Sequence, residues 1–119
     1  MTKRFRRNGE NMDILNEAKK NFDYMVRIRR HMHEYPENSG VVVPEGGIIG
    51  QIHGGKPGKT VLLRADMDAL PIKESKTNLT KEKVCISKND GISHACGHDA
   101  HTAMLLAEAK ILNENKEDL

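Results

Sequence analysis

The first regular pattern in the sequence is a helical one near the N-terminus. Apolar residues recur there at helical intervals, and most charged residues fall on the opposite side, which is the pattern of an amphipathic helix. We predict this helix over residues 13–33, with Asp13 as its N-cap and Pro36 enforcing its end. The apolar positions are Ile14, Ala18, Phe22, Met25 and Met32.

Beyond residue 40 the pattern changes from helical to β. Two short β-prone runs, 48–52 and 60–64, are separated by the turn-rich loop 54–59, and a β-hairpin is the simplest way to pair them. The second run is continuously apolar at residues 61–63, which predicts a strand covered on both faces.

The remaining sequence predicts a loop, a turn and a second long helix. Residues 73–83 are polar and rich in lysine, so we expect a solvated loop there. Asn89-Asp90-Gly91 is a turn signal. From 100 to 112 apolar residues again recur at helical spacing, and their Met and Leu side chains are expected to serve packing.

Length and charge narrow the possible partners. The 119 residues allow one domain at most, and 19 basic against 17 acidic side chains give no general case for nucleic-acid or membrane binding. No segment approaches membrane-spanning length, and no apolar stretch follows the basic N-terminus as in a secretory signal, so we expect a cytoplasmic location. We predict that residues 1–12 form a basic, disordered tail, with Met12 as an alternative start to Met1.

The strongest chemical signal is the run His94-Ala95-Cys96-Gly97-His98-Asp99-Ala100-His101. Cys96 and His98 are one residue apart, so both side chains can point to one side, and a thiolate with an imidazole suits zinc or another late first-row divalent ion. His94, Asp99 and His101 are candidates for supporting roles around these ligands. A polar turn without metal is the alternative for this run.

A second acidic cluster follows the apolar run 60–64. Asp66 and Asp68 are expected to lie beyond the carboxyl end of a strand, where ligands bind in open α/β sheets. One of them can ligate a metal while the other orients a ligand histidine. Alone, such a pair is more often a solvated loop; likewise His33 and His53 would be surface or helix-end residues, and Cys85 a small buried apolar one.

At these residues the sequence resembles the amidohydrolase branch of the zinc aminoacylase and carboxypeptidase superfamily, which includes hippurate hydrolases, N-acyl-L-amino-acid amidohydrolases and plant indole-acetyl-amino-acid hydrolases. The resemblance covers most of the chain from about Val26 onward, in family order. Its stretches are Arg29-Arg30-His31-Met32-His33-Glu34-Tyr35-Pro36-Glu37, Gly54-Gly55-Lys56-Pro57-Gly58, Leu63-Arg64-Ala65-Asp66-Met67-Asp68-Ala69-Leu70-Pro71, Ser87-Lys88-Asn89-Asp90-Gly91 and His94-Ala95-Cys96-Gly97-His98-Asp99.

The resemblance implies an α/β fold, with residues 13–119 as the N-terminal portion of a catalytic domain whose central sheet lies between helices. It implies two divalent metals (zinc, manganese, cobalt and nickel are not distinguished), first ligands at Cys96 and His98, and metal-site support from Asp68 with Asp66 as its neighbour. The reaction it implies is hydrolysis of the amide bond of N-acyl amino acids or small peptides.

Several parts of the family pattern have no counterpart in this sequence. The family's general base lies in a Glu-Glu pair, and the sequence contains none. The distal histidine ligands and the inserted dimerisation domain are also missing, and a helix and a strand normally found after Pro36-Glu37 are not present. Because losing a general base costs 10²- to 10⁴-fold, we expect this polypeptide alone to be essentially inactive.

Two hypotheses remain open from the sequence. In the first, the chain is the N-terminal part of an amidohydrolase and works with a complementing C-terminal chain or as a homo-oligomer. In the second, it is a non-catalytic remnant that binds metal weakly or associates with an intact relative. A structural zinc module is disfavoured because a closed site needs four well-placed ligands.

Overall fold

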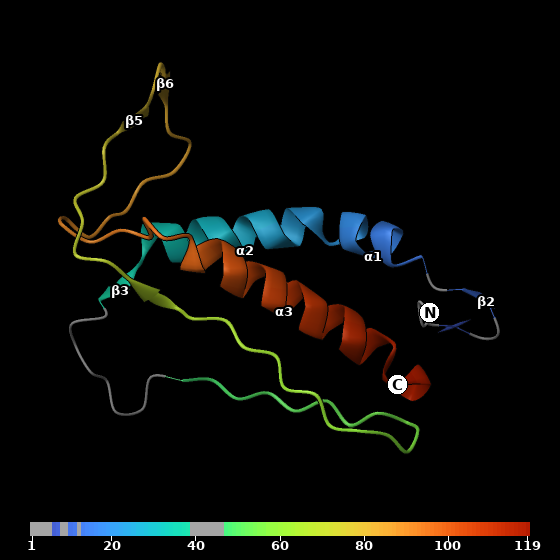
Figure 1. Ribbon diagram of the computed structural model, residues 1–119. Helices are drawn as coiled ribbons and strands as arrows, with labels where there is room; N and C mark the ends of the chain where they lie inside the picture. The colour runs from blue at the N-terminus through green and yellow to red at the C-terminus, as the bar shows by residue number, and fades with distance from the viewer. Residues whose placement is uncertain (1–5, 8–9, 12, 39–46) are drawn as a thin grey trace.

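The computed structural model describes residues 6–7, 10–11, 13–38 and 47–119. Its main body is a pair of helical segments that lie side by side (Figure 1). The first segment consists of α1 (Ile14–Lys20) and α2 (Phe22–Glu34), and the second is α3 (His98–Glu114), followed by the short 3-10 helix η1 (Lys116–Asp118). The packing of α2 against α3 is the most extensive contact between elements and positions the residues discussed below.

Three two-stranded ladders accompany the helices. β1 (Arg6–Arg7) pairs with β2 (Glu10–Asn11) and β5 (Thr77–Asn78) with β6 (Lys81–Glu82), both antiparallel. β3 (Glu37–Asn38) pairs in parallel with β4 (Asp68–Ala69). An isolated bridge between Leu70 and Ser93 then ties the end of β4 to the segment that leads into α3. Helices and strands together make the fold α/β, as expected from the resemblance.

The helix predicted over residues 13–33 is present but interrupted. Asp13 is its N-cap, since its side chain accepts a hydrogen bond from the Asn16 N–H at 3.1 Å. The break falls at Asn21, which is buried and donates from its side-chain amide to the Glu17 carbonyl at 3.0 Å. Lys110 of α3 donates to the same side chain at 2.9 Å, so a tertiary contact stabilises the break.

The predicted hairpin is wrong as a pair of hydrogen-bonded strands. No strand is formed anywhere in residues 47–67. The run expected to be covered on both faces is open to solvent, with Val61 76% and Leu62 87% exposed. The physical reason is that no described strand extends beside either run, so β propensity finds no partner to pair with.

The turn-rich loop between these runs is anchored instead to the C-terminal end. The Gly55 N–H donates to the Lys116 carbonyl at 2.8 Å, and the Lys56 N–H to the Leu119 carbonyl at 2.7 Å. A side chain at Gly55 would meet the Glu117 carbonyl oxygen at 2.8 Å, which explains why glycine stands at this close approach of two backbones.

Residues 73–83, predicted as a solvated loop, are exposed apart from Glu74 and Lys83 but contain the β5–β6 hairpin. The predicted turn at residues 89–91 is confirmed: the Ile92 N–H donates to the Asn89 carbonyl at 3.2 Å, and Gly91 has φ +80°. Four residues of the predicted N-terminal tail form the β1–β2 ladder, and the other eight lie outside the described residues. Disorder of this tail stays a prediction.

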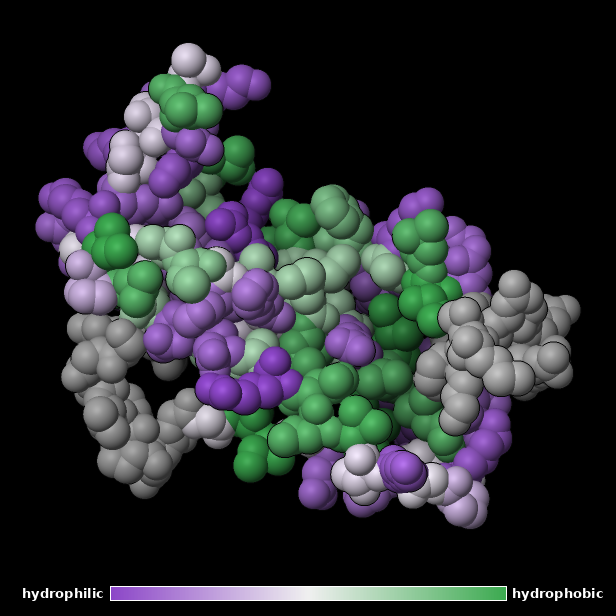
Figure 2. Space-filling model, in the orientation of Figure 1, coloured by the Kyte–Doolittle hydropathy of each residue, from purple (hydrophilic) through white to green (hydrophobic). Residues whose placement is uncertain are grey.

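The core is small and made of small residues. Among the described residues its buried apolar members are Ala69, Ala103 and Ala107, the last two on α3. Figure 2 shows apolar surface spread over the helical body. Within the described ranges no helix has the length and apolarity needed to cross a membrane.

Candidate metal centre and its supporting network

Asp68 and His98 are brought together by β4 and the start of α3. The His98 Nδ1 lies 2.9 Å from the Asp68 carboxylate and 3.0 Å from the Asp68 backbone carbonyl. Both of these oxygen atoms are acceptors, so the His98 Nδ1 carries the hydrogen and is the donor. The lone pair of a neutral His98 ring is therefore on Nε2, which is the arrangement in which a carboxylate orients a metal-ligating histidine.

Cys96 lies two residues before His98, just ahead of the first turn of α3, and its side chain is exposed. Gly97 between them is the N-cap and has φ +90°, in the left-handed region. This conformation turns the chain sharply between the candidate ligands, and it is one that residues other than glycine adopt only at a cost.

Replacing Gly97 by alanine should therefore destabilise the protein. A Cβ at this position would meet nothing within 4 Å, so the expected cost comes from the backbone alone, about 1–2 kcal/mol of unfolding free energy. The measurement is urea unfolding followed by far-UV circular dichroism. Gly58→Ala is the matched control, because its Cβ also meets nothing and its φ is ordinary. Equal losses in both variants would contradict the expectation.

Asp99, directly after His98, is completely buried and points toward α2. Its carboxylate lies 2.7 Å from the Arg29 Nε and 2.8 Å from the His33 Nδ1, and it also accepts from the Ala100 N–H at 2.9 Å. A buried carboxylate requires such partners, because an unpaired buried charge is expensive. Since His98 and Asp99 are neighbours on one helix, their contacts to β4 and α2 hold the first turn of α3 from two directions.

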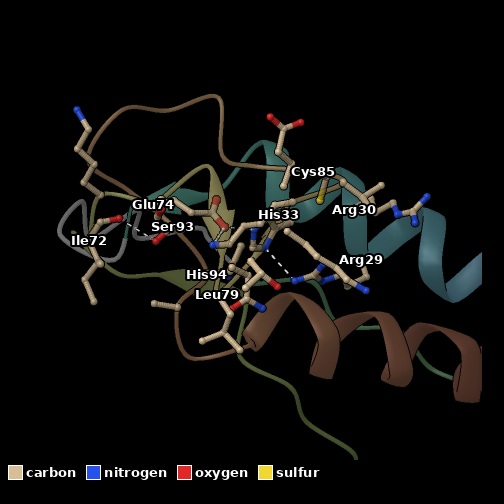
Figure 3. A pocket seen from close by; sticks show the side chains of 18 residues that line it. Arg29, Arg30, His33, Ile72, Glu74, Leu79, Cys85, Ser93 and His94 are labelled. Carbon is tan, nitrogen blue, oxygen red and sulfur yellow. Dashed lines mark hydrogen bonds and ion pairs between the residues drawn. The ribbon is translucent and has the colours of Figure 1, made fainter.

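His33 connects this carboxylate to a second one. Its Nε2 lies 2.9 Å from Glu74 (Figure 3), and its Nδ1 lies 2.8 Å from the Asp99 carboxylate. Of the two alternatives for His33, the helix-end one is confirmed, because it lies in the last turn of α2, and the surface one is wrong, because it is only 6% exposed. The spacing of Arg29 and His33, four residues apart on one face of a helix, is the signal that could have found the pair. The similar expectation for His53 is confirmed by its exposure.

Glu74 is the outer end of this network. Burial acts to raise the pKa of its carboxyl, but hydrogen bonds from the Lys83 ammonium at 2.9 Å, the Ser87 N–H at 2.7 Å and His33 outweigh burial. The pKa of Glu74 is lowered to about 2, so the carboxylate stays ionised over the physiological range. Sequence reasoning placed Glu74 in a solvated loop and missed it.

The remaining candidates lie around these groups. His94 is buried, burial lowers the pKa of its imidazole, and its Nδ1 has no hydrogen-bond partner among the described residues. His101 is exposed, with its ring 6.3 Å from that of His98. Asp66 is ion-paired with Arg64 at the surface. Cys85 is half-buried, rather than fully buried as expected, and burial raises the pKa of its thiol.

The candidate ligands in this chain fit one part of a metal centre. Cys96 and His98 are of the right types for a zinc-like ion, and His98 has the carboxylate behind it that such ligands use. Within the part of the chain that the structure describes, no group of three or more His, Cys, Asp or Glu side chains is arranged to hold a metal ion. The structure therefore shows two candidate ligands with a carboxylate beside one of them. The metal-site roles of these and the other candidates stay predictions: Cys96, His98, Asp68, Asp66, Asp99, His94 and His101.

Comparison with known proteins identifies the family. The sequence is 44% identical over 126 residues to thermostable carboxypeptidase 1 of Saccharolobus solfataricus, a match that covers 87% of this chain and 31% of the relative. The model of peptidase family M20/M25/M40 matches residues 62–119, which include both Asp68 and His98. Residues 62–119 belong to this peptidase family. The resemblance recognised from the sequence is thereby confirmed, and it places the candidate metal centre in the matched half.

Two further relatives support this family assignment. The N-acyl-L-amino acid amidohydrolase of Geobacillus stearothermophilus is 49% identical over 116 residues, covering 80% of this chain and 30% of the relative. A crystal structure from Bacillus subtilis, described as a dinuclear metal-binding peptidase of the M20 family, superposes with a TM-score of 0.65 at 31% identity, covering 83% of this chain and 33% of that one.

The chain spans about a third of the length of the M20 relatives it matches. The 126 aligned positions of the carboxypeptidase exceed the 119 residues of this chain, so the relative has positions without a counterpart here. The absence of a helix and a strand after Pro36-Glu37 stays a prediction.

Proposed function

We propose that this chain provides part of the metal centre of an M20 amidohydrolase, which hydrolyses the amide bond of N-acyl amino acids or small peptides. Cys96 and His98 would hold a divalent ion such as zinc or manganese, and Asp68 would fix the His98 ring. The observation that carries the proposal is the 2.9 Å contact between Asp68 and the His98 Nδ1, which leaves Nε2 free for a ligand.

When bound, such an ion polarises a carbonyl and lowers the pKa of water. The residues of this chain do the positioning. Asp68 keeps the hydrogen on the His98 Nδ1, Gly97 sets the turn between Cys96 and His98, and Asp99 fixes the helix that carries them. The names of the amidohydrolase and carboxypeptidase relatives support the substrate class.

We propose further that residues 13–119 are the N-terminal portion of the catalytic domain, located in the cytoplasm, and that residues 1–12 are an accessory basic tail. A complementing chain or a second copy would be the partner of this portion. The chain covers 31% of the carboxypeptidase and 33% of the Bacillus subtilis structure, which supports a portion rather than the whole of a catalytic domain.

Cobalt binding tests the proposal directly. Titration of Co²⁺ into the chain, followed by absorption, should give a thiolate-to-cobalt band that Cys96→Ser abolishes and His98→Gln weakens. Asp68→Ala should raise the Co²⁺ dissociation constant about 10- to 100-fold, because losing the group behind a ligand histidine has effects of that size. Asp90→Ala, which removes an exposed carboxylate, is the control. A cobalt spectrum unaffected by Cys96→Ser would overturn the proposal.

The alternative is a non-catalytic remnant that binds metal weakly or associates with an intact relative. It is favoured by the small donor set, since among the described residues no group of three or more His, Cys, Asp or Glu side chains is arranged to hold a metal ion. Hydrolysis assays separate the two functions. Metal-dependent turnover after mixing with a chain that bears a Glu-Glu pair supports the enzyme, and its absence supports the remnant.

A further inference from the structure

A hollow of about 820 Å³ lies beside the candidate metal centre. It is an open hollow bordered by α2, the segment 72–75, the β5–β6 hairpin and residues 93–95. In Figure 3, His33, Glu74 and His94 gather in the middle of the view, with Arg30 and Ile72 at opposite ends. Neither Cys96 nor His98 lines it. The volume is within the range of small-molecule sites.

The inner wall contains a polar atom that lacks a partner. His94 is 5% exposed, and its buried Nδ1 makes no hydrogen bond within the described part of the chain. Leaving a buried polar group unsatisfied costs about 1–3 kcal/mol, and a ligand in the hollow recovers this cost when the His94 ring turns its Nδ1 toward it. His33 beside it is fixed between Glu74 and Asp99, so this part of the wall is preorganised.

The charge around the hollow is positive. Its wall carries five cationic side chains against the carboxylates Glu74 and Glu82. Three of the cations are already paired, and Arg30 and Lys81 have no carboxylate partner among the described residues. The paired ones are Arg29 with Asp99, Lys73 with Asp90 and Lys83 with Glu74. An anion entering the hollow is therefore attracted rather than repelled.

The same wall exposes apolar side chains. Leu79 is 96% and Val84 81% exposed although both are apolar, and Ile72 lies on the same wall. Leu79 also stands at the hairpin tip with φ +51°, a conformation unfavourable for a branched side chain. Inorganic phosphate would leave this apolar surface in water, whereas a ligand with a hydrocarbon part would cover it.

We propose that this hollow is a binding site for a small amphipathic carboxylate. The carboxylate group of the ligand would lie toward His94, Arg30 and Lys81, and its hydrocarbon part would lie on Leu79 and Val84. The site is separate from the metal ligands, so binding requires no metal ion.

The test is an NMR titration of the metal-free chain with hexanoate, in chelator, with the neutral isostere hexanamide as the ligand control. Hexanoate should shift the His94 side-chain and hairpin resonances in a saturable way and bind at least tenfold more tightly than hexanamide. His94→Phe keeps an aromatic ring but removes both nitrogens, and it should weaken hexanoate about tenfold. His31→Phe, at an exposed position of α2, should leave the affinity unchanged.

A second variant keeps the proposal testable if His94→Phe fails to fold. The exposed double change Arg30→Gln with Lys81→Gln should weaken hexanoate several-fold and leave hexanamide unaffected. Equal binding of hexanoate and hexanamide, tighter binding of phosphate than of hexanoate, or the absence of saturable shifts would each overturn the proposal.

Discussion

Replacing Asp99 by asparagine is expected to lower the free energy of unfolding by about 3 kcal/mol. Breaking a buried ion pair by removing one partner costs about 3–5 kcal/mol. We expect the lower end of this range for two reasons. Arg29 is 41% exposed and can turn to water, and His33 keeps Glu74 as its second partner. A loss of this size is a large fraction of the stability of a small domain.

Urea unfolding monitored by circular dichroism at 222 nm measures this loss. Asp90→Asn is the matched control, since it removes a carboxylate from an ion pair with Lys73 in which both side chains are more than three-quarters exposed. Exposed pairs contribute about 0–1 kcal/mol. If Asp99→Asn cost no more than Asp90→Asn, the buried network would not stabilise the fold.

Lowering the pH should remove the contribution of Glu74 to the free energy of unfolding over a defined range. Its folded-state pKa of about 2 lies below the ordinary value of 4.5, so its stabilisation is present above pH 4.5 and disappears as the pH falls toward 2. The difference in pKa corresponds to about 3 kcal/mol at neutral pH. Glu74→Gln should therefore be less stable than the parent at pH 7 and nearly equal to it near pH 2.

The measurement is the free energy of unfolding of both proteins from pH 7 to pH 2. Glu108→Gln, which removes a carboxylate from the exposed side of α3, controls for the general effect of losing one negative charge. A difference between Glu74→Gln and the parent that stayed constant across the acid range would show that ionisation of Glu74 is not linked to folding.

The local elements could be predicted from the sequence because their signals are local. Asp13 as the N-cap, the end of the first helical segment before Pro36 and the glycine turn at residue 91 all depend on neighbours a few positions away. The break at Asn21 could not be predicted, since the contact that stabilises it comes from Lys110, 89 positions along the chain.

The candidate metal centre was partly predictable for a similar reason. The spacing of Cys96 and His98 and the acidic pair at residues 66 and 68 indicate metal binding in the sequence itself. The structure brings Asp68 and His98 together. The roles of His33 and Glu74 depend on their distance from Asp99 in space. A pattern read along the chain does not contain that distance, so the burial of His33 could not be predicted.

The contact between His33 and Asp99 also has a consequence for the order of folding. These residues are 66 positions apart, and the Asp68–His98 contact spans 30. The turns of α3 can form from local hydrogen bonds, but its first turn gains fixed partners only after both loops close, which is a slow step because it costs chain entropy. The segment carrying Cys96 should thus reach its final position late, and an ion present during refolding would meet a mobile thiol before it meets an oriented imidazole.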